Sequence, residues 1–506
     1  MLSIVHSGAL RGIEVVDVTI EVNSGERGDP RFIMVGLPDA AVKESHDRVF
    51  SALSNSGFMC PRMRTTVNLA PGYIRKEGSF YDLPIALGVI QSTAQVSMKL
   101  LDEFVIAGEL SLSGTISDIR GGIAFSLYAR QNAKKLILPP KSAAEAALVE
   151  GVEVFVADSL ANVTDFLSGG TPLARAVPVI KDLWAADRNY AIDFSDVTGQ
   201  LVLRRAVEIA VAGGHNLLMI GSPGSGKSMV AKRIPTIMPR PSMDEIIDII
   251  NIYSAAGMSL GEGESCFRRP FRSPHHTISS VGLLGGGVIP GPGEVSLAHN
   301  GVLFLDELAE FNRATLEVLR QPLEDGEITI SRSSGKVTFP CSIILVAAMN
   351  PCPCGFLGDK AGRCKCSPGQ VAKYRSRISG PLIDRFDIQI DVPAVSLADL
   401  CGHRRGECSA DIKVRVERAR AIQNARFKDT ETTNARMVNV RDGCPLNGTC
   451  QNLLDMAMKN LHLSARAYDK ILKVARTIAD LATSEDILEK HILEAIQYRS
   501  LDRIFF

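Results

Sequence analysis

Residues 216–228 read NLLMIGSPGSGKS, an apolar strand that runs into a glycine-rich loop. In a loop of this kind the glycines let backbone N–H groups turn inward around phosphates, and the helix that follows adds a favourable dipole. We therefore expect Lys227 to reach the β and γ phosphates of a bound nucleotide and Ser228 to ligate Mg²⁺. The alternative is an ordinary glycine turn between a strand and a helix. The loop matches the pattern G-x-x-x-x-G-K-[ST] with Gly221, Ser222, Pro223, Gly224, Ser225, Gly226, Lys227 and Ser228.

A second apolar strand, at residues 302–305, ends in two acidic residues, Asp306 and Glu307. Parallel strands deliver their carboxyl ends to one edge of a sheet, which is where α/β folds bind ligands. We therefore expect Asp306 to lie beside the glycine-rich loop and to hold Mg²⁺ through its water shell. Glu307 is then expected to orient and activate the water that attacks the γ phosphate. The alternative is that the acidic pair only begins a helix, because acids suit a first turn.

A third apolar strand, at residues 343–348, runs into Met349 and Asn350. If this strand lies next to the first, the amide of Asn350 is placed to position the attacking water or to sense the γ phosphate. The same residue type is equally common in turns, which is the alternative for Asn350.

Phosphoryl transfer also needs positive charge at the transition state, and ring ATPases take it as an arginine from a neighbouring subunit. Arg385, in the segment GPLIDRFD at 380–387, is the candidate for this arginine. Arg466, at the start of a predicted helix, is the second arginine expected near the nucleotide. For either one the alternative is a surface ion pair, for example between Arg385 and Asp384 or Asp387.

Around this core the chain is expected to divide into four parts. Residues 1–170 combine strands and helices in an α/β domain, and residues 171–195 contain two prolines and no clear periodicity, as a linker would. Residues 196–395 alternate helices with short apolar strands, which predicts a parallel sheet buried on both faces. Residues 396–506 are mainly helical. The expected strands lie at 13–22, 65–69, 216–220, 302–305 and 343–348, and the expected helices at 40–54, 124–133, 412–427, 450–460 and 465–481.

The composition is that of a globular protein of several domains. The 506 residues are 45% hydrophobic and 22% charged, with a formal net charge of zero. Any affinity for nucleic acid must therefore come from local basic patches rather than from bulk charge. No apolar run is long enough for a membrane helix, and the first residues lack the features of a signal peptide, so we expect a cytoplasmic protein.

Four of the eleven cysteines form a compact set within fifteen residues. Four thiolates at this spacing suit a tetrahedral Zn²⁺ site that holds together a loop too short to hold itself. The C-x-C spacing is less usual than C-x-x-C, and free reduced thiols are the alternative. Such a site would be structural, because four sulfur ligands leave no position open for water. The four residues are Cys352, Cys354, Cys364 and Cys366.

Taken together, these strings resemble the magnesium-chelatase-like branch of the AAA+ ATPases, and specifically the ComM/YifB family. The resemblance also covers strings outside the loop and the acidic strand: GLPDAAVKES at 36–45, TVNLAP at 66–71, DLPIAL at 82–87, RSPHH at 272–276 and SARAY at 464–468. It implies an AAA+ core with a helical C-terminal lid and an N-terminal domain like that of Lon proteases. It further implies a homo-hexameric ring that uses ATP and Mg²⁺ to move on DNA, promoting branch migration during integration of transforming DNA.

The N-terminal region resembles the catalytic part of Lon proteases but lacks the residues for proteolysis. A serine–lysine dyad needs both members, because the lysine must take the serine proton. Ala124 stands where the resemblance places the lysine, and Phe80 stands where it places the serine. Ser79 lies next to that position and is the one remaining candidate nucleophile. We therefore expect a structural or DNA-guiding role for this domain.

Two segments are candidates for contacts with DNA in the channel of a ring. Residues 327–338 read as a β-hairpin, with Arg332 and Lys336 near its tip in reach of phosphates. Residues 282–293 contain six glycines and are the candidate for a second, flexible loop. Solvated charges and an ordinary connector are the respective alternatives. The competing function is a protein remodeller like the ATPase subunit of magnesium chelatase, while Phe80 and Ala124 argue against an ATP-dependent protease.

Overall fold

The computed structural model describes residues 1–26, 31–178, 190–258, 268–287, 290–332, 335–358, 362–394, 406–428, 432–461 and 463–501. The chain forms two compact units. The first unit comprises residues 1–186 with two additions from the middle of the chain, 243–265 and 331–337. The second comprises 187–242, 266–330 and 338–506. The finer boundaries at 170, 195 and 395 stay predictions.

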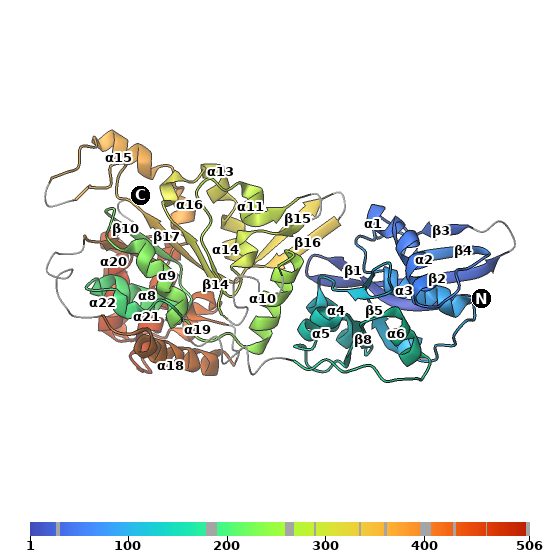
Figure 1. Ribbon diagram of the computed structural model, residues 1–506. Coiled ribbons are helices and arrows are strands. Elements are labelled where there is room, and N and C mark those ends of the chain that lie inside the picture. The colour runs from blue at the N-terminus through green and yellow to red at the C-terminus, as the bar shows by residue number, and fades with distance from the viewer. Residues whose placement is uncertain are drawn as a thin grey trace. The chain divides into compact units, whose positions relative to one another are not determined.

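The first unit is built on a seven-stranded sheet with the order β3-β4-β2-β1-β5-β8-β9 (Figure 1). Alternate residues of β2, among them Val18, Ile20 and Val22, are fully buried, which is the pattern of a strand with one face against a core. Helix α3 packs against β1 and β2 and is buried on nearly every side. The strands are β1 (Leu2–Arg11), β2 (Glu14–Glu26), β3 (Phe32–Val35), β4 (Arg64–Ala70), β5 (Phe104–Ile106), β8 (Lys135–Leu138) and β9 (Val154–Val156).

Helices and a small two-stranded sheet complete the first unit. Helix α10 (Met243–Ala255) comes from the middle of the chain and packs against α4, where the N–H of Gly121 donates to Ser254 Oγ at 2.9 Å. The other helices are α1 (Ala40–Lys43), α2 (Ser45–Asn55), α3 (Asp82–Ser92), α4 (Gly122–Gln131), α5 (Pro140–Ala146) and α6 (Leu160–Leu167), and the small sheet pairs β6 (Glu109–Leu110) with β7 (Ile116–Ser117).

The second unit contains a five-stranded sheet with the order β11-β14-β17-β10-β18, and every pairing in it is parallel. The prediction of a parallel sheet is confirmed. Strands β10 and β14 are buried along their whole length, as expected for strands covered on both faces. Helix α8 packs against β10 and β18, and α9 against β14 and β17. The strands are β10 (Leu217–Gly221), β11 (Phe271–Arg272), β14 (Gly301–Leu305), β17 (Ile343–Met349) and β18 (Ile388–Val392).

The two segments proposed for a channel form β structure. Strands β15 (Glu327–Arg332) and β16 (Gly335–Pro340) make the expected two-stranded sheet, with residues 333–334 of its tip outside the described residues. In the glycine-rich segment β12 (Gly285–Gly286) pairs with β13 (Gly291–Pro292), and residues 288–289 lie outside the described residues.

Helices make up most of the remainder of the second unit. They are α8 (Leu201–Gly213), α9 (Lys227–Ile237), α11 (Ser280–Leu284), α12 (Glu294–Leu297), α13 (Arg313–Glu317), α14 (Arg320–Asp325), α15 (Pro368–Arg375), α16 (Gly380–Ile383), α18 (Ser409–Phe427), α19 (Val440–Gly443), α20 (Gly448–Leu461), α21 (Ala465–Leu481) and α22 (Glu489–Gln497). Among the helices of the described residues, none is both long and apolar enough to span a bilayer.

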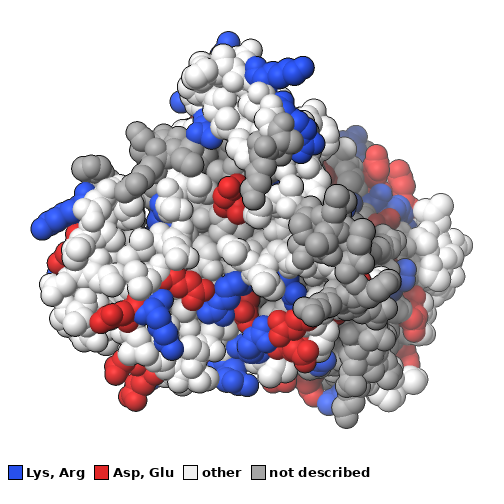
Figure 2. All heavy atoms as spheres, turned by 90° about the vertical axis from the view of Figure 1, so that its left-hand side faces the viewer, with Lys and Arg blue, Asp and Glu red and all other residues white. Residues whose placement is uncertain are grey.

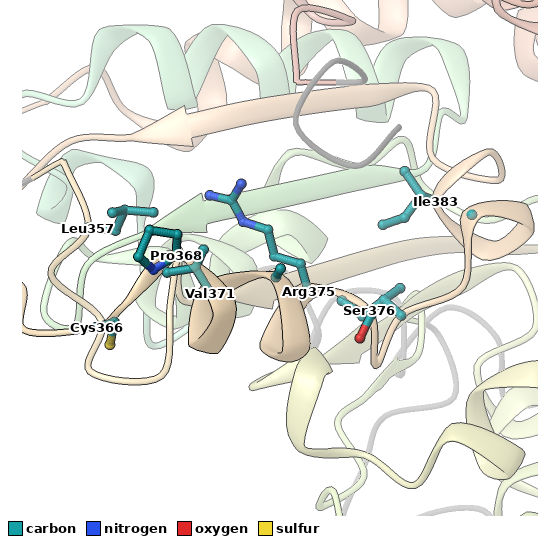
Figure 3. A pocket seen from close by; sticks show the side chains of 10 residues that line it. Leu357, Cys366, Pro368, Val371, Arg375, Ser376 and Ile383 are labelled. Carbon is teal, nitrogen blue, oxygen red and sulfur yellow. The ribbon is translucent and has the colours of Figure 1, made fainter.

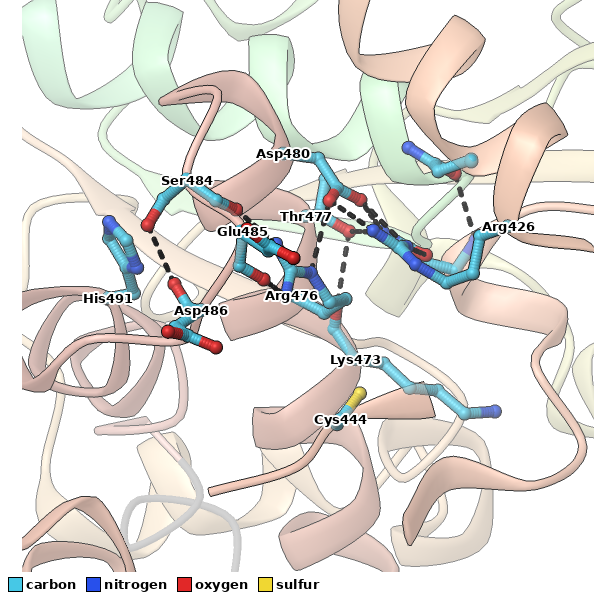
Figure 4. A network of polar contacts seen from close by, with 12 residues as sticks. Arg426, Cys444, Lys473, Arg476, Thr477, Asp480, Ser484, Glu485, Asp486 and His491 are labelled. Carbon is cyan, nitrogen blue, oxygen red and sulfur yellow. Dashed lines mark hydrogen bonds and ion pairs between the residues drawn. The ribbon is translucent and has the colours of Figure 1, made fainter. Parts of the chain in front are cut away.

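A buried polar network holds the C-terminal helices together (Figure 4). The carboxylate of Asp480 is fully buried and accepts from Arg426 Nη2 at 2.5 Å and from Arg476 Nε at 3.0 Å. Thr477 Oγ1 lies 2.8 Å from Nε2 of His215, which lies just before β10. Because buried charges are tolerated only when they are paired, this network fixes α21 against α18 and against the start of β10.

Candidate nucleotide-binding site

The glycine-rich loop, residues 221–228, connects the end of β10 to the start of α9. Gly224 and Gly226 have φ values of +78° and +88°, in the left-handed region that favours glycine. A Cβ on Gly221 would lie 2.4 Å from the carbonyl oxygen of Val392 in the neighbouring strand β18, so a side chain is excluded there too. The loop's glycines are therefore required by its backbone path, and we call it the phosphate loop from here on.

Lys227 folds back over this loop. Its Nζ donates to the carbonyl oxygens of Gly221 at 2.7 Å and Ser222 at 2.9 Å, and the residue is 8% exposed. Burial lowers the pKa of Lys227, an effect that the carboxylate of Asp306 opposes. The ammonium group is thus held at the mouth of the loop by neutral oxygens, which a phosphate can displace.

The acidic strand end meets the phosphate loop as predicted. Strand β17 lies between β10 and β14, with Met349 opposite Ile220 and Ala347 opposite Leu305. This register aligns the carboxyl ends of the three strands at one edge of the sheet. There Ser228 Oγ donates to Asp306 Oδ2 at 2.6 Å. A hydroxyl and a carboxylate, the two ligand types proposed for Mg²⁺, are already in contact.

Glu307 follows in an unusual backbone conformation, with φ +52°. Its side chain is 58% exposed, and Oε2 lies 3.3 Å from Nδ1 of His276. The acidic pair also precedes a short 3₁₀ helix, Leu308–Glu310. The pair therefore begins a helix, as the alternative held, and also lies beside the phosphate loop. In the sequence His276 stands out only as part of RSPHH; it follows β11, the strand next to β14, and only the strand order reveals it as a neighbour of Glu307.

Asn350 directly follows β17 and is half-buried. Because Met349 pairs with Ile220, Asn350 stands at the same sheet edge as Gly221, the first residue of the phosphate loop. Its place in the fold therefore fits the expected role toward the nucleotide.

The two arginines lie elsewhere. Arg385 forms an ion pair with Glu324 of α14, and its side chain is only 11% exposed. The ion-pair alternative is thus realised with a partner other than Asp384 or Asp387. Arg466 is exposed in the first turn of α21. Within the described part of the chain, no hydrogen bond or ion pair joins either arginine to the phosphate loop.

The four cysteines gather at one point, in the loop between β17 and α15. The sulfur of Cys352 lies 3.4 Å from that of Cys354 and 3.8 Å from that of Cys364, while the sulfurs of Cys354 and Cys364 are 3.7 Å apart. All four sulfurs lie within 4.8 Å of one another. Several hydrogen bonds to the Cys354 sulfur, the strongest from the N–H of Phe356, together lower the pKa of that thiol to about 6. Four sulfurs at these distances can hold a tetrahedral metal ion.

A cavity of about 490 Å³ lies beside the cysteine loop (Figure 3). It is lined by Leu357 and Cys366 from the loop, by Val371 and Arg375 from α15, and by Ile383 from α16. Most of its walls are apolar. None of its lining residues comes from the phosphate loop, so this cavity is not the candidate nucleotide site.

In the first unit, the positions where the resemblance places a protease dyad are filled by apolar side chains. Phe80 is 8% exposed and its ring packs edge-on against Phe125, with 5.7 Å between the ring centroids. Ala124 is buried in α4. The hydroxyl of the neighbouring Ser79 donates to the carboxylate of Glu109. These contacts give Phe80 and Ala124 a role in the core.

A parallel sheet with a glycine-rich loop after one strand, and an acid after the strand two places away, defines a phosphate-loop nucleotide-binding domain. Comparison with known proteins is consistent with this class and narrows it. The family described as "Magnesium chelatase, subunit ChlI" matches residues 193–400, "Subunit ChlI of Mg-chelatase" matches 20–142, and "Magnesium chelatase, subunit ChlI C-terminal" matches 406–499.

Two relatives that match along nearly their whole length point to the same family, and a third matches over part of its length. YifB of Escherichia coli (strain K12) is 43% identical over 510 residues, which cover 99% of this chain and 98% of that protein. Competence protein ComM of Haemophilus influenzae is also 43% identical, over 511 residues and the same shares of both chains. The maternal DNA replication licensing factor mcm6 of Xenopus tropicalis is 21% identical over 310 residues, 58% of this chain and 33% of its own length. The chain belongs to the ComM/YifB family of magnesium-chelatase-like ATPases.

Proposed function

We propose that this protein hydrolyses ATP at the phosphate loop and, assembled as a ring, uses the energy to move along DNA, promoting branch migration in the recombination of transforming DNA. The observation that carries the proposal is the contact of 2.6 Å between Ser228 and Asp306, because it joins the loop to the acidic strand end. Neither half of such a site is sufficient alone: the loop binds phosphate, and the acid holds the metal.

Each residue of the site has a distinct task in this proposal. ATP supplies the phosphoryl group, and Mg²⁺ would neutralise the charge on its oxygens. Lys227 exchanges its carbonyl partners for phosphate oxygens, and Ser228 and Asp306 hold the metal. Glu307, at the exposed end of the acidic pair, orients the attacking water, with Asn350 as the candidate second contact. Arg385 acts on the nucleotide of a neighbouring subunit once it leaves Glu324.

DNA as the partner is supported by a basic projection on the second unit. The stretch from residue 363 to residue 383 is rich in Lys and Arg and contains no acidic residue, in a chain whose net charge is zero. Four of its basic residues are exposed: Arg363, Lys365, Lys373 and Arg377. Figure 2 shows Lys and Arg side chains gathered on the projection at the top of the face drawn. A basic surface of this kind suits the phosphates of a nucleic acid, and the names of two relatives, a competence protein and a DNA replication licensing factor, favour DNA.

The alternative is a protein remodeller. It is favoured by the three matches to descriptions of a magnesium-chelatase subunit, which together reach from residue 20 to residue 499. A remodeller would respond to a protein partner rather than to DNA.

We also propose that the four cysteines hold Zn²⁺, the metal that four thiolates favour. With Zn–S bonds of about 2.3 Å, the sulfurs of a tetrahedral site lie about 3.8 Å apart. The sulfur–sulfur distances of 3.4, 3.7 and 3.8 Å agree with that value. Reduced thiols without a metal are the alternative.

ATP hydrolysis with and without forked DNA tests the proposal, using the intact protein, Lys227→Ala and Glu307→Gln. We expect forked DNA to raise the rate of the intact protein. Lys227→Ala should lose ATP binding, whereas Glu307→Gln should still bind ATP and hydrolyse it about 100-fold more slowly or worse, as expected when a general base is removed. If forked DNA leaves the rate of the intact protein unchanged, the motor proposal fails and the remodeller is favoured.

A further inference from the structure

The loop that carries the cysteines touches the phosphate loop. Residues 352–355 form a turn in which the N–H of Gly355 donates to the carbonyl oxygen of Cys352 at 2.9 Å. A Cβ on Gly355 would lie 2.6 Å from Cδ and 2.8 Å from Cγ of Pro223, the third residue of the phosphate loop. The absence of a side chain at residue 355 therefore lets the backbone of the turn rest directly on the proline ring.

The same turn also reaches the candidate γ-phosphate sensor. A Cβ on Gly355 would be 3.7 Å from Cγ of Asn350, and Asn350 is separated from Cys352 by Pro351 alone. Gly355 itself has φ +83°, a conformation that a residue with a side chain adopts only with strain. One short turn thus contacts two parts of the proposed nucleotide site, and a shift of this turn would be felt by both.

The sulfur cluster is what ties the turn to the rest of its loop. Cys352 is buried, but Leu357 and Cys366 line the cavity of about 490 Å³ rather than a packed core (Figure 3). The regular element next to Cys366 is helix α15, which begins two residues after it and is stabilised at its start by a capping box of Ser367 and Gln370. A metal bound to all four sulfurs would connect the turn, through Cys364 and Cys366, to this helix.

We propose that the four-cysteine site is a metal-dependent brace for the phosphate loop, so that a metal held by these thiolates is required for tight nucleotide binding. The metal would act on the nucleotide at a distance, through Gly355 and Pro223. Its loss, by chelation or by oxidation of the thiols to disulfides with a two-electron oxidant such as a peroxide, would release the turn and loosen the loop. This inference rests on the proposed function, since it concerns the same nucleotide site.

The test starts with the metal itself. Elemental analysis of the purified protein should find about one zinc per chain, four thiolates being the expected number of ligands for one ion. Co²⁺ offered to the metal-free protein should give the absorption of a tetrahedral thiolate site. Both signals should disappear in Cys354→Ser with Cys364→Ser, and both should persist in Cys60→Ser, which removes a half-buried thiol outside the cluster. A protein that takes up neither ion would overturn the proposal at this step.

Nucleotide affinity is measured next, with a fluorescent ATP analogue. Removing the metal from the intact protein should weaken binding at least tenfold, and adding Zn²⁺ back should restore it. Gly355→Ala is the sharper variant: it keeps all four cysteines, so it should retain its metal and yet bind nucleotide at least tenfold more weakly. Because the chelation arm uses the intact protein, the test does not depend on any variant folding well.

The outcomes separate this inference from the proposed function. If the intact protein binds ATP equally well with and without the metal, the brace is refuted while the ATPase stands. If removing the metal weakens binding but Gly355→Ala binds ATP as well as the intact protein does, the route through Gly355 and Pro223 is refuted. If the intact, metal-loaded protein does not bind ATP, the proposed function and the brace fall together. A double-mutant cycle of Gly355→Ala with Pro223→Ala should be non-additive by at least threefold in affinity; additive effects would contradict the contact.

Discussion

Glu307 has the backbone conformation of a residue under local strain, and its carboxylate leans toward a histidine that follows the neighbouring strand. A positive φ at a non-glycine residue costs about 1–3 kcal/mol and persists only where the surroundings hold it. Here the N–H of Glu307 donates to Asp306 Oδ1 at 2.9 Å, and Oε2 lies 3.3 Å from His276 Nδ1. These two contacts fix both ends of the residue proposed to orient the attacking water.

We predict that His276→Ala lowers kcat for ATP hydrolysis and leaves KM nearly unchanged, because His276 contacts Glu307 rather than the phosphate loop. The expected loss is about tenfold, less than the 100-fold or more of losing a general base outright. Steady-state kinetics measure both constants, and His276→Asn should recover part of the loss. His46→Ala is the control, since His46 lies in the first unit and pairs with Asp47. An increase in KM with constant kcat would show that His276 serves nucleotide binding.

The sequence was sufficient to predict the positions of site residues that belong to a recognisable motif next to a recognisable strand. The position of Asp306 beside the glycine-rich loop was predicted because the loop and the acidic strand end are each recognisable in the chain, and the structure adds the direct contact between Asp306 and Ser228. The partner of Arg385 was not, because Glu324 lies 61 residues away and the pairing depends on how α14 packs. His276 was missed for the same reason.

Among the elements, the loop after α16 is tied to helix α21 by an ion pair that is largely but not fully buried. Asp387 directly precedes β18, and its Oδ1 lies 2.9 Å from Nζ of Lys470 in α21. Although burial opposes ionisation, the Lys470 ammonium holds the pKa of Asp387 well below its ordinary value. A carboxyl group with a depressed pKa stabilises the fold at a pH above its unfolded pKa, and this contribution is lost as the pH falls toward the folded pKa.

We predict that Asp387→Asn destabilises the protein by about 3 kcal/mol at pH 7, the lower end of the range for a buried pair, because it removes the carboxylate partner of the largely buried Lys470 ammonium group. Urea-induced unfolding measured at several pH values checks this. The difference from the intact protein should be constant at neutral pH and should shrink below about pH 4, the ordinary range for an aspartate. Asp469→Asn, on the same helix and less buried, should change the midpoint little. A difference that persists unchanged at low pH would mean that charge is not its source.

Helix and strand boundaries followed the sequence closely where the periodicity was long. The predicted helix at 465–481 has these bounds in the structure, and β14 and β17 begin or end within one residue of their predictions. In the first unit, strands β1, β3, β5, β8 and β9 were not predicted. In the sheet of the second unit, β11 and β18 were not predicted. The first has two residues, and the second, IQIDV, lacks the continuous apolar run of a fully buried strand. Their places come from the packing of the sheet.

For the whole molecule, neutral net charge conceals a local asymmetry. The basic projection lies on the second unit and contains two of the four clustered cysteines, Cys364 and Cys366, so a candidate DNA surface adjoins a candidate metal site. The composition alone could indicate that such a patch must exist if the protein binds DNA; only the fold shows which basic side chains are exposed together.

We predict that Lys365→Ala with Lys373→Ala weakens DNA binding at every sequence tested. The logarithm of the DNA-binding constant falls with the logarithm of the salt concentration, and this slope should become shallower by about 2, roughly one for each lysine removed from a phosphate. Binding measured over a range of salt concentrations checks this, with basal ATP hydrolysis expected to be unchanged. Lys413→Ala with Lys459→Ala, on helices α18 and α20, is the control. An unchanged salt slope would place the DNA contacts elsewhere.

In the proposed site the phosphate loop and a metal-holding acid act together, so the affinity for ATP should depend on Mg²⁺. Equilibrium binding of ATP is measured with Mg²⁺ and with EDTA, for the intact protein and for Asp306→Asn. We expect Mg²⁺ to tighten binding by the intact protein at least tenfold and to have little effect on the variant. If the intact protein binds ATP equally in both conditions, or if the variant responds to Mg²⁺ as the intact protein does, the account of this site is contradicted.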